Sequence, residues 1–484
     1  MRIFEMMSAC FNILMLGWLI LGKHKPQRGL LIGFGVSAAF VLMQWLIEGM
    51  RWQILPVHAI TLVPLLIIAV RYIPRREEAP RKASRLKLGL ICIFAVFYCF
   101  LAVALPLALP VIKFDKPSGP YKIGTVTYHW KDEKREEGYA PQSGDKRELM
   151  IQIWYPADSK AKGKRAPYVS NADIFAQGYG QALHMPKMLF TSIGFIKTNA
   201  IENATISNQE PTYPVLIFSH SLNGVKNQNT FQIEQLVSQG YIVVGIDHTY
   251  NSTVSLFPDG RVVHFVPQES NAIEDLDRLN MVWVEDAKFV LDQVEELANH
   301  DPNQRFTGRM DLNNIGMFGH SFGGATTTQM LMTDSRIKAG INMDGGLYGK
   351  LRIPEEGVNK PFLMMSADDT LAGTQNMSDA NIASQGTTRA ELDQFFADTL
   401  ARYEHVAVGG NYWLKINKMK HMGFSDMYMI SPLFEWMEGV NVKKVHGLIN
   451  DYSLDFFNHY LKQQPSKLLE KNIGEHSEYS LERG

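Results

Sequence analysis

The chain has 484 residues, of which 46% are hydrophobic, and its formal net charge is −1. This length allows more than one domain, and the balance of charge argues against nucleic acid as a partner. All three cysteines, Cys10, Cys92 and Cys99, precede residue 114, so the rest of the chain has no disulfide framework, cysteine-based zinc site or cysteine nucleophile.

The first 113 residues are mostly apolar and contain four long hydrophobic runs. These runs cover residues 6–22, 29–47, 55–73 and 88–112. Because ~17–25 apolar residues are needed to cross a bilayer, they predict a transmembrane anchor of four helices over residues 1–113. The runs contain no carboxylate, and we interpret His58 and Pro64 in the third run as marking a structural kink in preference to a transport or proton path. We therefore expect these helices to act as an anchor.

The loops between these runs predict the orientation of the chain. Basic residues follow the first and third runs, whereas the loop after the second run offers only Arg51. The basic residues are Lys23, Lys25, Arg28, Arg71, Arg75, Arg76, Arg81, Lys82, Arg85 and Lys87. Because Lys and Arg are retained on the cytoplasmic side, both basic loops should be cytoplasmic. The sequence predicts a multi-pass protein of the cell membrane with residues 114–484 outside the cytoplasm.

Residues 114–484 have the mixed composition of a globular domain. Short β-branched or apolar runs alternate with helical patterns, which is typical of a mostly parallel sheet flanked by helices. An antiparallel pair is expected first, at 122–128 and 149–155. Six further strands are expected at 215–218, 241–246, 315–318, 338–343, 361–366 and 412–416.

Helical spacing of apolar residues predicts amphipathic helices at 284–298 and 453–461. The second of these helices is expected to close the edge of the sheet, and the polar tail, 464–484, is expected to be loose. Residues 171–207 do not follow the alternation of strands and helices, so we expect an inserted cap there. A hydrophobic lid and an ordinary surface insertion both fit its composition.

The strongest chemical signal is the motif Gly-His-Ser-Phe-Gly at residues 319–323, which has the form G-x-S-x-G. It lies between a predicted strand and a predicted helix, the context of a nucleophile elbow in the α/β-hydrolase fold. Such a turn holds its serine in a strained conformation and needs glycine on either side because a Cβ would collide with neighbouring strands. The motif predicts Ser321 as a nucleophile.

A serine nucleophile needs a histidine base, and in this fold the base follows the last strands of the sheet. His421 lies in that place, so we predict it as the general base. The other candidates are His320, inside the elbow and too constrained, and His220 and His248, which follow earlier strands and are interpreted as structural.

The carboxylate that orients the base has two candidate positions. Asp344 follows the strand after the nucleophile, whereas Asp368 follows the next strand, which is the commoner position in α/β hydrolases. Spacing alone leaves both open.

Four motifs in this part of the chain occur together and in a fixed order. They are Phe-Ser-His-Ser-Leu-Asn at 218–223, the elbow at 319–324, Met-Asp-Gly at 343–345, and His421 followed by Phe-Ser-Asp at 424–426. In these motifs residues 121–461 resemble the platelet-activating factor acetylhydrolases of the plasma, intracellular type II and bacterial types. The chain would be a membrane-anchored bacterial member, because the secreted and cytosolic members lack the four runs.

The resemblance favours Asp344 as the acid, and it implies a serine esterase that removes short or oxidised acyl chains from phospholipids. One departure stands out. The family has Ser-His-Gly-Leu-Gly where this chain has Ser-His-Ser-Leu-Asn, so Ser221 and Asn223 replace glycines in the loop expected to bind the oxyanion.

The expected mechanism is ester hydrolysis through an acyl-enzyme, with the backbone N–H groups of Leu222 and Phe322 as the oxyanion hole. The expected substrates are short-chain acyl esters or platelet-activating factor-like lipids. No metal or cofactor is implied. Three alternatives remain: a cutinase-like polyester or lipid esterase that uses Asp368, a non-catalytic membrane receptor on a hydrolase fold, and acyl transfer to an alcohol. The sequence does not indicate an oligomeric state.

Overall fold

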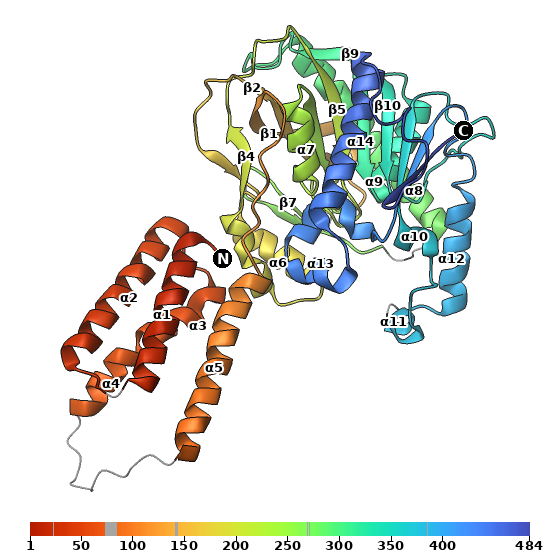
Figure 1. Cartoon of the computed structure of the whole chain (residues 1–484). Coiled ribbons are helices and arrows are strands. Elements are labelled where there is room, and N and C mark those ends of the chain that lie inside the picture. The colour runs from red at the N-terminus through yellow and green to blue at the C-terminus, as the bar shows by residue number, and fades with distance from the viewer. Residues whose placement is uncertain (23, 73–84, 141–143, 269, 271, 385) are drawn as a thin grey trace. The chain divides into compact units, whose positions relative to one another are not determined.

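The computed structural model describes the whole chain except residues 23, 73–84, 141–143, 269, 271 and 385 (Figure 1). The chain forms two compact units. The N-terminal unit comprises Met1–Ile112, Met188–Ile196 and Ile430–Leu433, and the C-terminal unit comprises Lys113–Lys187, Lys197–Met429 and Phe434–Gly484. The chain thus returns twice to the N-terminal unit, which differs from the expected single division into residues 1–113 and 114–484.

The described part of the first 112 residues is built mainly from helices. These are α1 (Ile3–Leu21), α2 (Gln27–Glu48), η1 (Trp52–Ile54), α3 (Leu55–Thr61), α4 (Val63–Tyr72) and α5 (Arg85–Ala108). Four stretches are long and apolar enough to cross a membrane, judged by length and composition: Ile3–Leu21, Gln27–Glu48, Trp52–Val70 and Gly89–Ala108. The third is interrupted at Leu62, two residues before Pro64, since a proline cannot donate a helical hydrogen bond.

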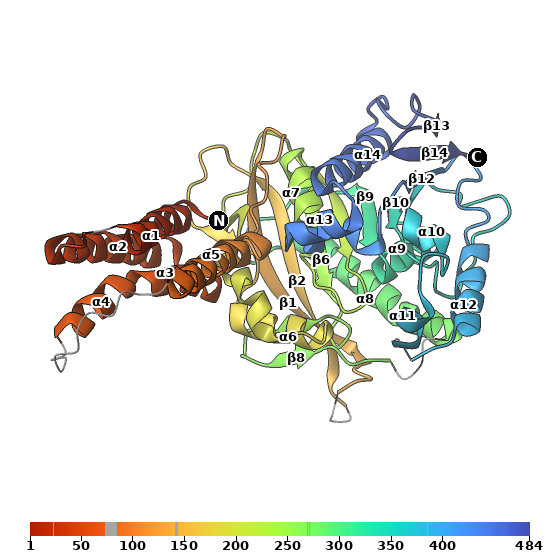
Figure 2. The same cartoon turned by 60° about the horizontal axis from the view of Figure 1, so that its bottom comes forward.

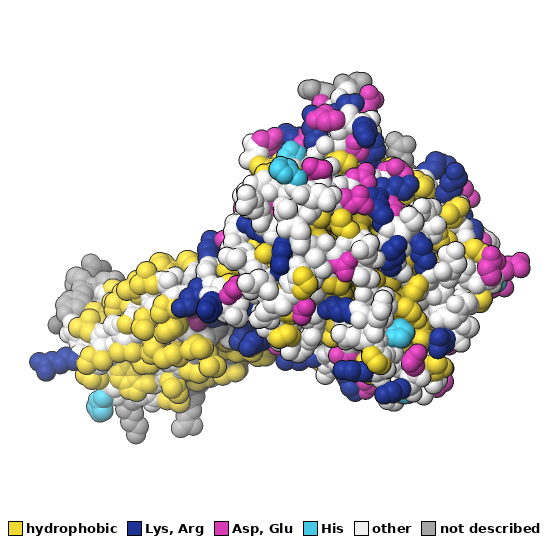
Figure 3. All heavy atoms as spheres, turned by 90° about the horizontal axis from the view of Figure 1, so that it is seen from above, with side chains coloured by type: hydrophobic (Ala, Val, Ile, Leu, Met, Phe, Trp, Pro, Cys, Tyr) yellow, Lys and Arg dark blue, Asp and Glu magenta, His cyan; other side chains and the backbone are white. Residues whose placement is uncertain are grey.

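The outer surface of these helices is hydrophobic, as Figure 3 shows for one face of the unit. Leu14, Leu46 and Phe94 each expose more than half of their surface. Lipid-facing helices have this distribution, because an apolar solvent does not drive their side chains inward. Among the basic residues that predict the orientation, five lie outside the described residues: Lys23, Arg75, Arg76, Arg81 and Lys82.

The interior of the N-terminal unit is more polar than the sequence predicted. Glu5, within α1, forms a buried ion pair with Arg51 at 2.7 Å. Two turns further along α1, Asn12 donates to the Val57 carbonyl at 2.9 Å and to the Thr61 hydroxyl at 3.2 Å. The expectation that the spans contain no carboxylate was therefore wrong. It failed because Glu5 lies just before the first apolar run, which was taken to begin at residue 6, and its partner is 46 residues away in the sequence.

The C-terminal unit is built on a sheet with the strand order β13-β14-β12-β11-β10-β9-β5-β6-β2-β1-β4-β3 (Figures 1 and 2). The six neighbouring strands β12, β11, β10, β9, β5 and β6 are parallel to one another, whereas β1 and β2 form an antiparallel pair. All eight expected strands occur, so the prediction of a mostly parallel sheet is confirmed. The bounds are β1 (Lys122–Glu136), β2 (Lys146–Ala157), β3 (Arg165–Pro167), β4 (Lys197–Glu202), β5 (Tyr213–Ser219), β6 (Ile242–Asp247), β9 (Met310–His320), β10 (Ile337–Met343), β11 (Phe362–Ala367), β12 (Tyr412–Ile416), β13 (Gly474–Glu475) and β14 (Tyr479–Arg483), with a separate hairpin of β7 (Val254–Leu256) and β8 (Val262–His264).

Helices cover both faces of this sheet. Along β5, Val215 and Ile217 pack into one hydrophobic core with α8, while Leu216 and Phe218 pack into a second core with α7 and α14. Successive side chains of a strand point to opposite faces, so a strand with helices on both sides is apolar throughout. The helices are α6 (Ala172–Ala182), η2 (Lys187–Phe195), α7 (Thr230–Ser238), α8 (Ile273–Asn299), α9 (Phe322–Thr333), α10 (Asp368–Ala372), α11 (Asp379–Ser384), α12 (Arg389–Ala401), η3 (His421–Phe424), η4 (Asp426–Met429), α13 (Pro432–Glu438) and α14 (Val442–Lys462).

Two expectations for the C-terminal part of the chain, residues 442–484, are corrected by the structure. Residues 464–484 are not loose, because β14 pairs antiparallel with β12 and buries Leu481. The helix expected at 453–461 is the second half of α14, and it packs on the face of the sheet against α7, β9 and β10 instead of closing its edge. The edge is closed by the tail strands, which are too short and too polar to give a strand pattern.

The segment expected to be an inserted cap, 171–207, has three parts. It begins with α6, whose N-terminus is capped by the Asn171 side chain. Residues 188–196 belong to the N-terminal unit. Lys197–Glu202 forms β4, which pairs with β1 and β3. The last part is therefore sheet and not cap.

Candidate active site

Ser321 lies at the sharp turn between β9 and α9. Its backbone has φ +57° and ψ −121°, a conformation that non-glycine residues rarely adopt. The Ser321 N–H donates to the Met343 carbonyl of β10 at 2.8 Å, which ties the turn to the neighbouring strand. The strand-turn-helix geometry is that of a nucleophile elbow.

The glycines around Ser321 are required by close packing. A Cβ on Gly319 would lie 2.2 Å from the Gly323 carbonyl oxygen. A Cβ on Gly323 would lie 2.1 Å from the Ser219 carbonyl oxygen on β5. Both distances are far below van der Waals contact, so the elbow can form only with glycine at these positions.

His421 begins η3, in the loop after β12. Its Nε2 lies 2.9 Å from the Ser321 Oγ, and its Nδ1 lies 2.6 Å from the Asp344 Oδ2. A carboxylate can only accept, so Nδ1 carries the proton and Nε2 is free to accept the serine proton. The structure therefore brings together the hydroxyl, imidazole and carboxylate that the sequence suggested from three distant segments.

Asp344 follows β10 and is held rigidly. Its side chain is fully buried, its Oδ1 accepts from the Ala367 N–H at 2.9 Å, and its Oδ2 also accepts from the Thr370 hydroxyl at 2.6 Å. Asp368, the alternative acid, accepts instead from the Lys418 N–H at 3.1 Å. The carboxylate against His421 is thus the one favoured by the resemblance.

His320 supports the loop that carries His421. It is fully buried, and its Nε2 donates to the His421 carbonyl at 3.0 Å. Its Nδ1 accepts from the Gln228 amide at 3.0 Å. Burial, together with the nearby His421 ring, holds the pKa of His320 well below its usual range, so this imidazole is neutral.

A second row of serine, histidine and aspartate begins at Ser219, the last residue of β5. His248 bonds to the Ser219 hydroxyl and to Asp286, each at 2.9 Å, and all three side chains are fully buried. Although burial opposes it, pairing with Arg147 holds the pKa of Asp286 below its usual range. Because all three side chains are buried, substrate has no access to Ser219.

Leu222 and Phe322 lie beside the nucleophile. Phe322 is the first residue of α9, so its N–H precedes the intrahelical hydrogen bonds. Leu222 lies in the loop after β5, where Asn223 adopts φ +60° in place of the family's glycine. Asparagine is among the residues that tolerate this conformation best. The chain can therefore make this turn without glycine.

Ser321, Leu222 and Phe322 open into a cavity of about 820 Å³ between the N-terminus of α8 and helix α12. One group of its lining residues is apolar: Leu222, Ile273, Leu276, Phe322, Tyr348, Leu392 and Phe395. Three carboxylates, Glu274, Glu391 and Asp398, also line it, and among the described residues its lining includes no lysine or arginine. The sequence did not predict this cavity, since its walls come from loops and helices far apart in the chain.

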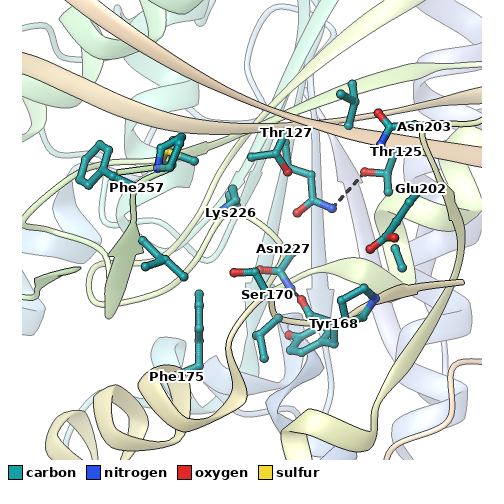
Figure 4. Close-up of a pocket in the computed structure, with 18 residues that line it drawn as sticks. Thr125, Thr127, Tyr168, Ser170, Phe175, Glu202, Asn203, Lys226, Asn227 and Phe257 are labelled. Carbon is teal, nitrogen blue, oxygen red and sulfur yellow. Dashed lines mark hydrogen bonds between the residues drawn. The ribbon is translucent and has the colours of Figure 1, made fainter. Parts of the chain in front are cut away.

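Another cavity, of about 460 Å³, lies over β1 and β2 near α6 (Figure 4). Its lining includes Gln152, whose amide donates to the Thr125 hydroxyl at 3.0 Å, together with Tyr168, Phe175 and Lys226. None of the residues of the Ser321 row lines it. Within the described residues, no group of three or more His, Cys, Asp or Glu side chains is arranged to hold a metal ion.

The fold and this site together define an α/β hydrolase. The sequence model of the family described as platelet-activating factor acetylhydrolase, isoform II, matches residues 109–259 and 285–391, more than half of the chain. The chain therefore belongs to this family. The matched residues include the loop after β5, Ser321 and Asp344, whereas His421 lies beyond them.

Individual relatives are more distant. A probable 1-alkyl-2-acetylglycerophosphocholine esterase of Arthroderma benhamiae is 32% identical over 28% of this chain and 32% of its own length. The platelet-activating factor acetylhydrolase of Cavia porcellus is 25% identical over 53% of this chain and 62% of its own length. The match thus spans less than two thirds of either relative. Among solved structures, a ferulic acid esterase from Streptomyces cinnamoneus has a TM-score of 0.59, with 24% identity, over 77% of this chain and 99% of that one, which supports the fold.

Proposed function

We propose that this chain is a serine carboxylic-ester hydrolase that acts through an acyl-enzyme. The observation that carries the proposal is the hydrogen-bonded row from Ser321 through His421 to Asp344, at a strained elbow that opens into an 820 Å³ cavity. A hydroxyl is a weak nucleophile at neutral pH, and this arrangement of base and carboxylate is what activates it.

In the proposed reaction, the Ser321 Oγ attacks the ester carbonyl while His421 Nε2 takes its proton. Asp344 stabilises the resulting imidazolium, and the N–H groups of Leu222 and Phe322 donate to the oxyanion. His421 then returns the proton to the leaving alcohol, and an acyl-enzyme remains. A water molecule, deprotonated by His421, attacks this ester and releases the acid with Ser321 restored.

For the substrate we propose short-chain acyl esters, including phospholipids that carry short acyl chains. The names of the two relatives support this class, since both refer to acetylated ether phospholipids. The size of the cavity, about 820 Å³, suits a small or medium-sized organic group. Hydrolysis of p-nitrophenyl acetate and labelling of Ser321 by a fluorophosphonate test the reaction class. A purified chain that does neither would overturn the proposal.

We propose that the lining of the cavity discriminates against anionic substrates. Glu274, Glu391 and Asp398 are exposed around the cavity, so an acyl chain that ends in a carboxylate should be repelled. For three charges at ~9 Å in water, we expect kcat/KM for p-nitrophenyl hemisuccinate to be about fivefold lower than for p-nitrophenyl valerate at ~10 mM salt. The ratio of the two kcat/KM values should approach one as salt is added, because dissolved ions screen charges that are this far apart.

The variant with Glu274→Gln, Glu391→Gln and Asp398→Asn should remove this discrimination. A glutamine at position 391 keeps the capping box at the start of α12. The matched control neutralises three carboxylates further along α8, of which two are exposed and Glu295 is half-buried, with Glu285→Gln, Asp292→Asn and Glu295→Gln, and should leave the ratio unchanged. Equal ratios in the wild type and both variants at low salt would contradict the prediction.

We propose that residues 1–113 anchor the enzyme as four transmembrane helices, with the hydrolase domain, 114–484, outside the cytoplasm. The four apolar stretches and the positions of the basic residues support this orientation. Protease added to intact cells should digest the hydrolase domain, whereas an epitope inserted between α4 and α5 should be cleaved only after permeabilisation. The reverse pattern would show that the orientation is inverted.

A further inference from the structure

Gln228 connects three segments of the site that are far apart in the sequence. It lies in the loop between β5 and α7 and is 6% exposed. Its side-chain oxygen accepts from the Ser221 hydroxyl at 2.9 Å, and its amide nitrogen donates to the His320 Nδ1 at 3.0 Å. Its backbone carbonyl accepts from the Asp426 N–H at 2.8 Å. One residue thus bonds to the oxyanion loop, to the elbow and to the loop that carries His421.

The side-chain bonds form a chain with one direction. The Ser221 hydroxyl donates to Gln228, Gln228 donates to His320, and His320 donates to the His421 carbonyl at 3.0 Å. Each donor meets an acceptor, and aligned hydrogen bonds of this kind strengthen one another. A neutral His320 is needed at the third step, because only a neutral imidazole both accepts and donates.

The two ends of this series of hydrogen bonds, Ser221 and the His421 loop, are the parts of the site whose separation matters for the proposed reaction. Ser221 precedes Leu222, whose N–H would stabilise the oxyanion, and His421 is the base. The Ser221 carbonyl accepts from the His220 Nδ1 at 2.6 Å, and the Ser221 hydroxyl donates separately to Gln228. The serine that replaces the family's glycine at 221 therefore has a specific partner.

We propose that Gln228 is a positioning residue for the ester hydrolysis: through Ser221 and His320 it sets the oxyanion loop at a fixed distance from the His421 loop. This inference rests on the proposed function. Gln228 touches neither the substrate nor the reacting atoms, so its loss should misplace the oxyanion N–H and the base relative to each other. It should leave the wall of the cavity in place.

The test uses the full-length chain in detergent and the variant Gln228→Met, which keeps the shape of the side chain and removes both polar groups. We expect kcat for p-nitrophenyl acetate to fall about 30-fold, because small displacements at a catalytic centre cost up to ~100-fold, while KM stays within about twofold. The Ki of a trifluoromethyl ketone, which adds to Ser321 and places an oxyanion in the hole, should rise in parallel with the loss of kcat/KM.

Gln232 provides the matched control. It is a buried glutamine on α7 whose amide donates to the Ser453 hydroxyl at 2.8 Å and whose oxygen accepts from Asn229 at 3.1 Å, away from the chain of bonds. Gln232→Met should lower the melting temperature about as much as Gln228→Met does. It should leave kcat and the ketone Ki within about twofold of the wild-type values, as expected of a purely structural change.

A further pair of variants tests the order of the bonds. Ser221→Gly removes the first bond only and should have a smaller effect than Gln228→Met. Because both changes break the same series of hydrogen bonds, the double variant should lose no more kcat than Gln228→Met alone. Additive effects, or equal losses in Gln228→Met and Gln232→Met, would show that Gln228 is only structural. A wild-type chain that neither hydrolyses esters nor reacts with fluorophosphonate would instead overturn the proposed function, and this inference with it.

Discussion

Replacing Ser321 by alanine is expected to lower kcat for p-nitrophenyl acetate by ~10⁶-fold and to abolish labelling by a fluorophosphonate. The hydroxyl lies 2.9 Å from the His421 Nε2, so its removal leaves the base without a nucleophile to activate. The fold should survive, because the backbone strain of the elbow and the glycines around it are unchanged. A normal melting temperature with no activity is therefore the expected result.

Three further variants identify the row of residues that is responsible. His421→Ala should cost about as much as Ser321→Ala, and the double variant should be no worse, since the residues act as a unit. Ser219→Ala changes the buried row at the end of β5 and should leave labelling intact. If Ser321→Ala retained more than about 1% of activity while Ser219→Ala lost it, the nucleophile would have been assigned to the wrong row.

The elbow could be predicted from the sequence because its geometry makes local demands. Gly319 and Gly323 stand within three residues of Ser321, and each is required by a backbone atom closer than 2.5 Å to the place of a Cβ. A strained turn of this kind therefore restricts which amino acids can occur within five consecutive residues. The parallel strands were predictable for a similar reason, because strands buried on both faces are continuous apolar runs.

The choice between Asp344 and Asp368 could not be made from spacing, because both follow a strand of the sheet. In the structure it is Asp344 that contacts the histidine: it adopts φ +57°, which accompanies the approach of its carboxylate to the Ala367 N–H and to His421. Neither contact is visible in the local sequence. The resemblance to a known family supplied the information that the residues themselves lacked.

Gln228 and Glu5 were missed because their partners are distant in the sequence. Gln228 bonds to His320, 92 residues later, and Glu5 pairs with Arg51, 46 residues later. A polar side chain in a loop or beside an apolar run is ordinarily solvated, so it gives no signal of burial. The replacement of a family glycine by Ser221 was the only hint in the sequence of the hydrogen bonds around Gln228.

The substitution Asp344→Asn is expected to lower kcat by ~10⁴-fold, because it forces the wrong tautomer on the base. In the wild type the Ala367 N–H donates to Oδ1 of Asp344 at 2.9 Å. Because this N–H can only donate, the carbonyl oxygen of the new amide must take the place of Oδ1. The amide NH₂ then faces His421 Nδ1, which must accept. Nε2 carries the proton in that tautomer and cannot take one from Ser321.

Asp368→Asn is the matched control for this substitution. The amide that it introduces can still accept from the Lys418 N–H, which lies 3.1 Å from the Asp368 carboxylate, so the loop should keep its shape and kcat should stay within about twofold. Purified variants are compared by kcat on p-nitrophenyl acetate and by the rate of fluorophosphonate labelling. A large loss in Asp368→Asn together with near-normal Asp344→Asn would assign the acid to the loop after β11. Both variants replace one carboxylate by an amide of nearly the same size. A difference of about 10⁴ between their kcat values therefore reports the tautomer of His421 and not a change in net charge.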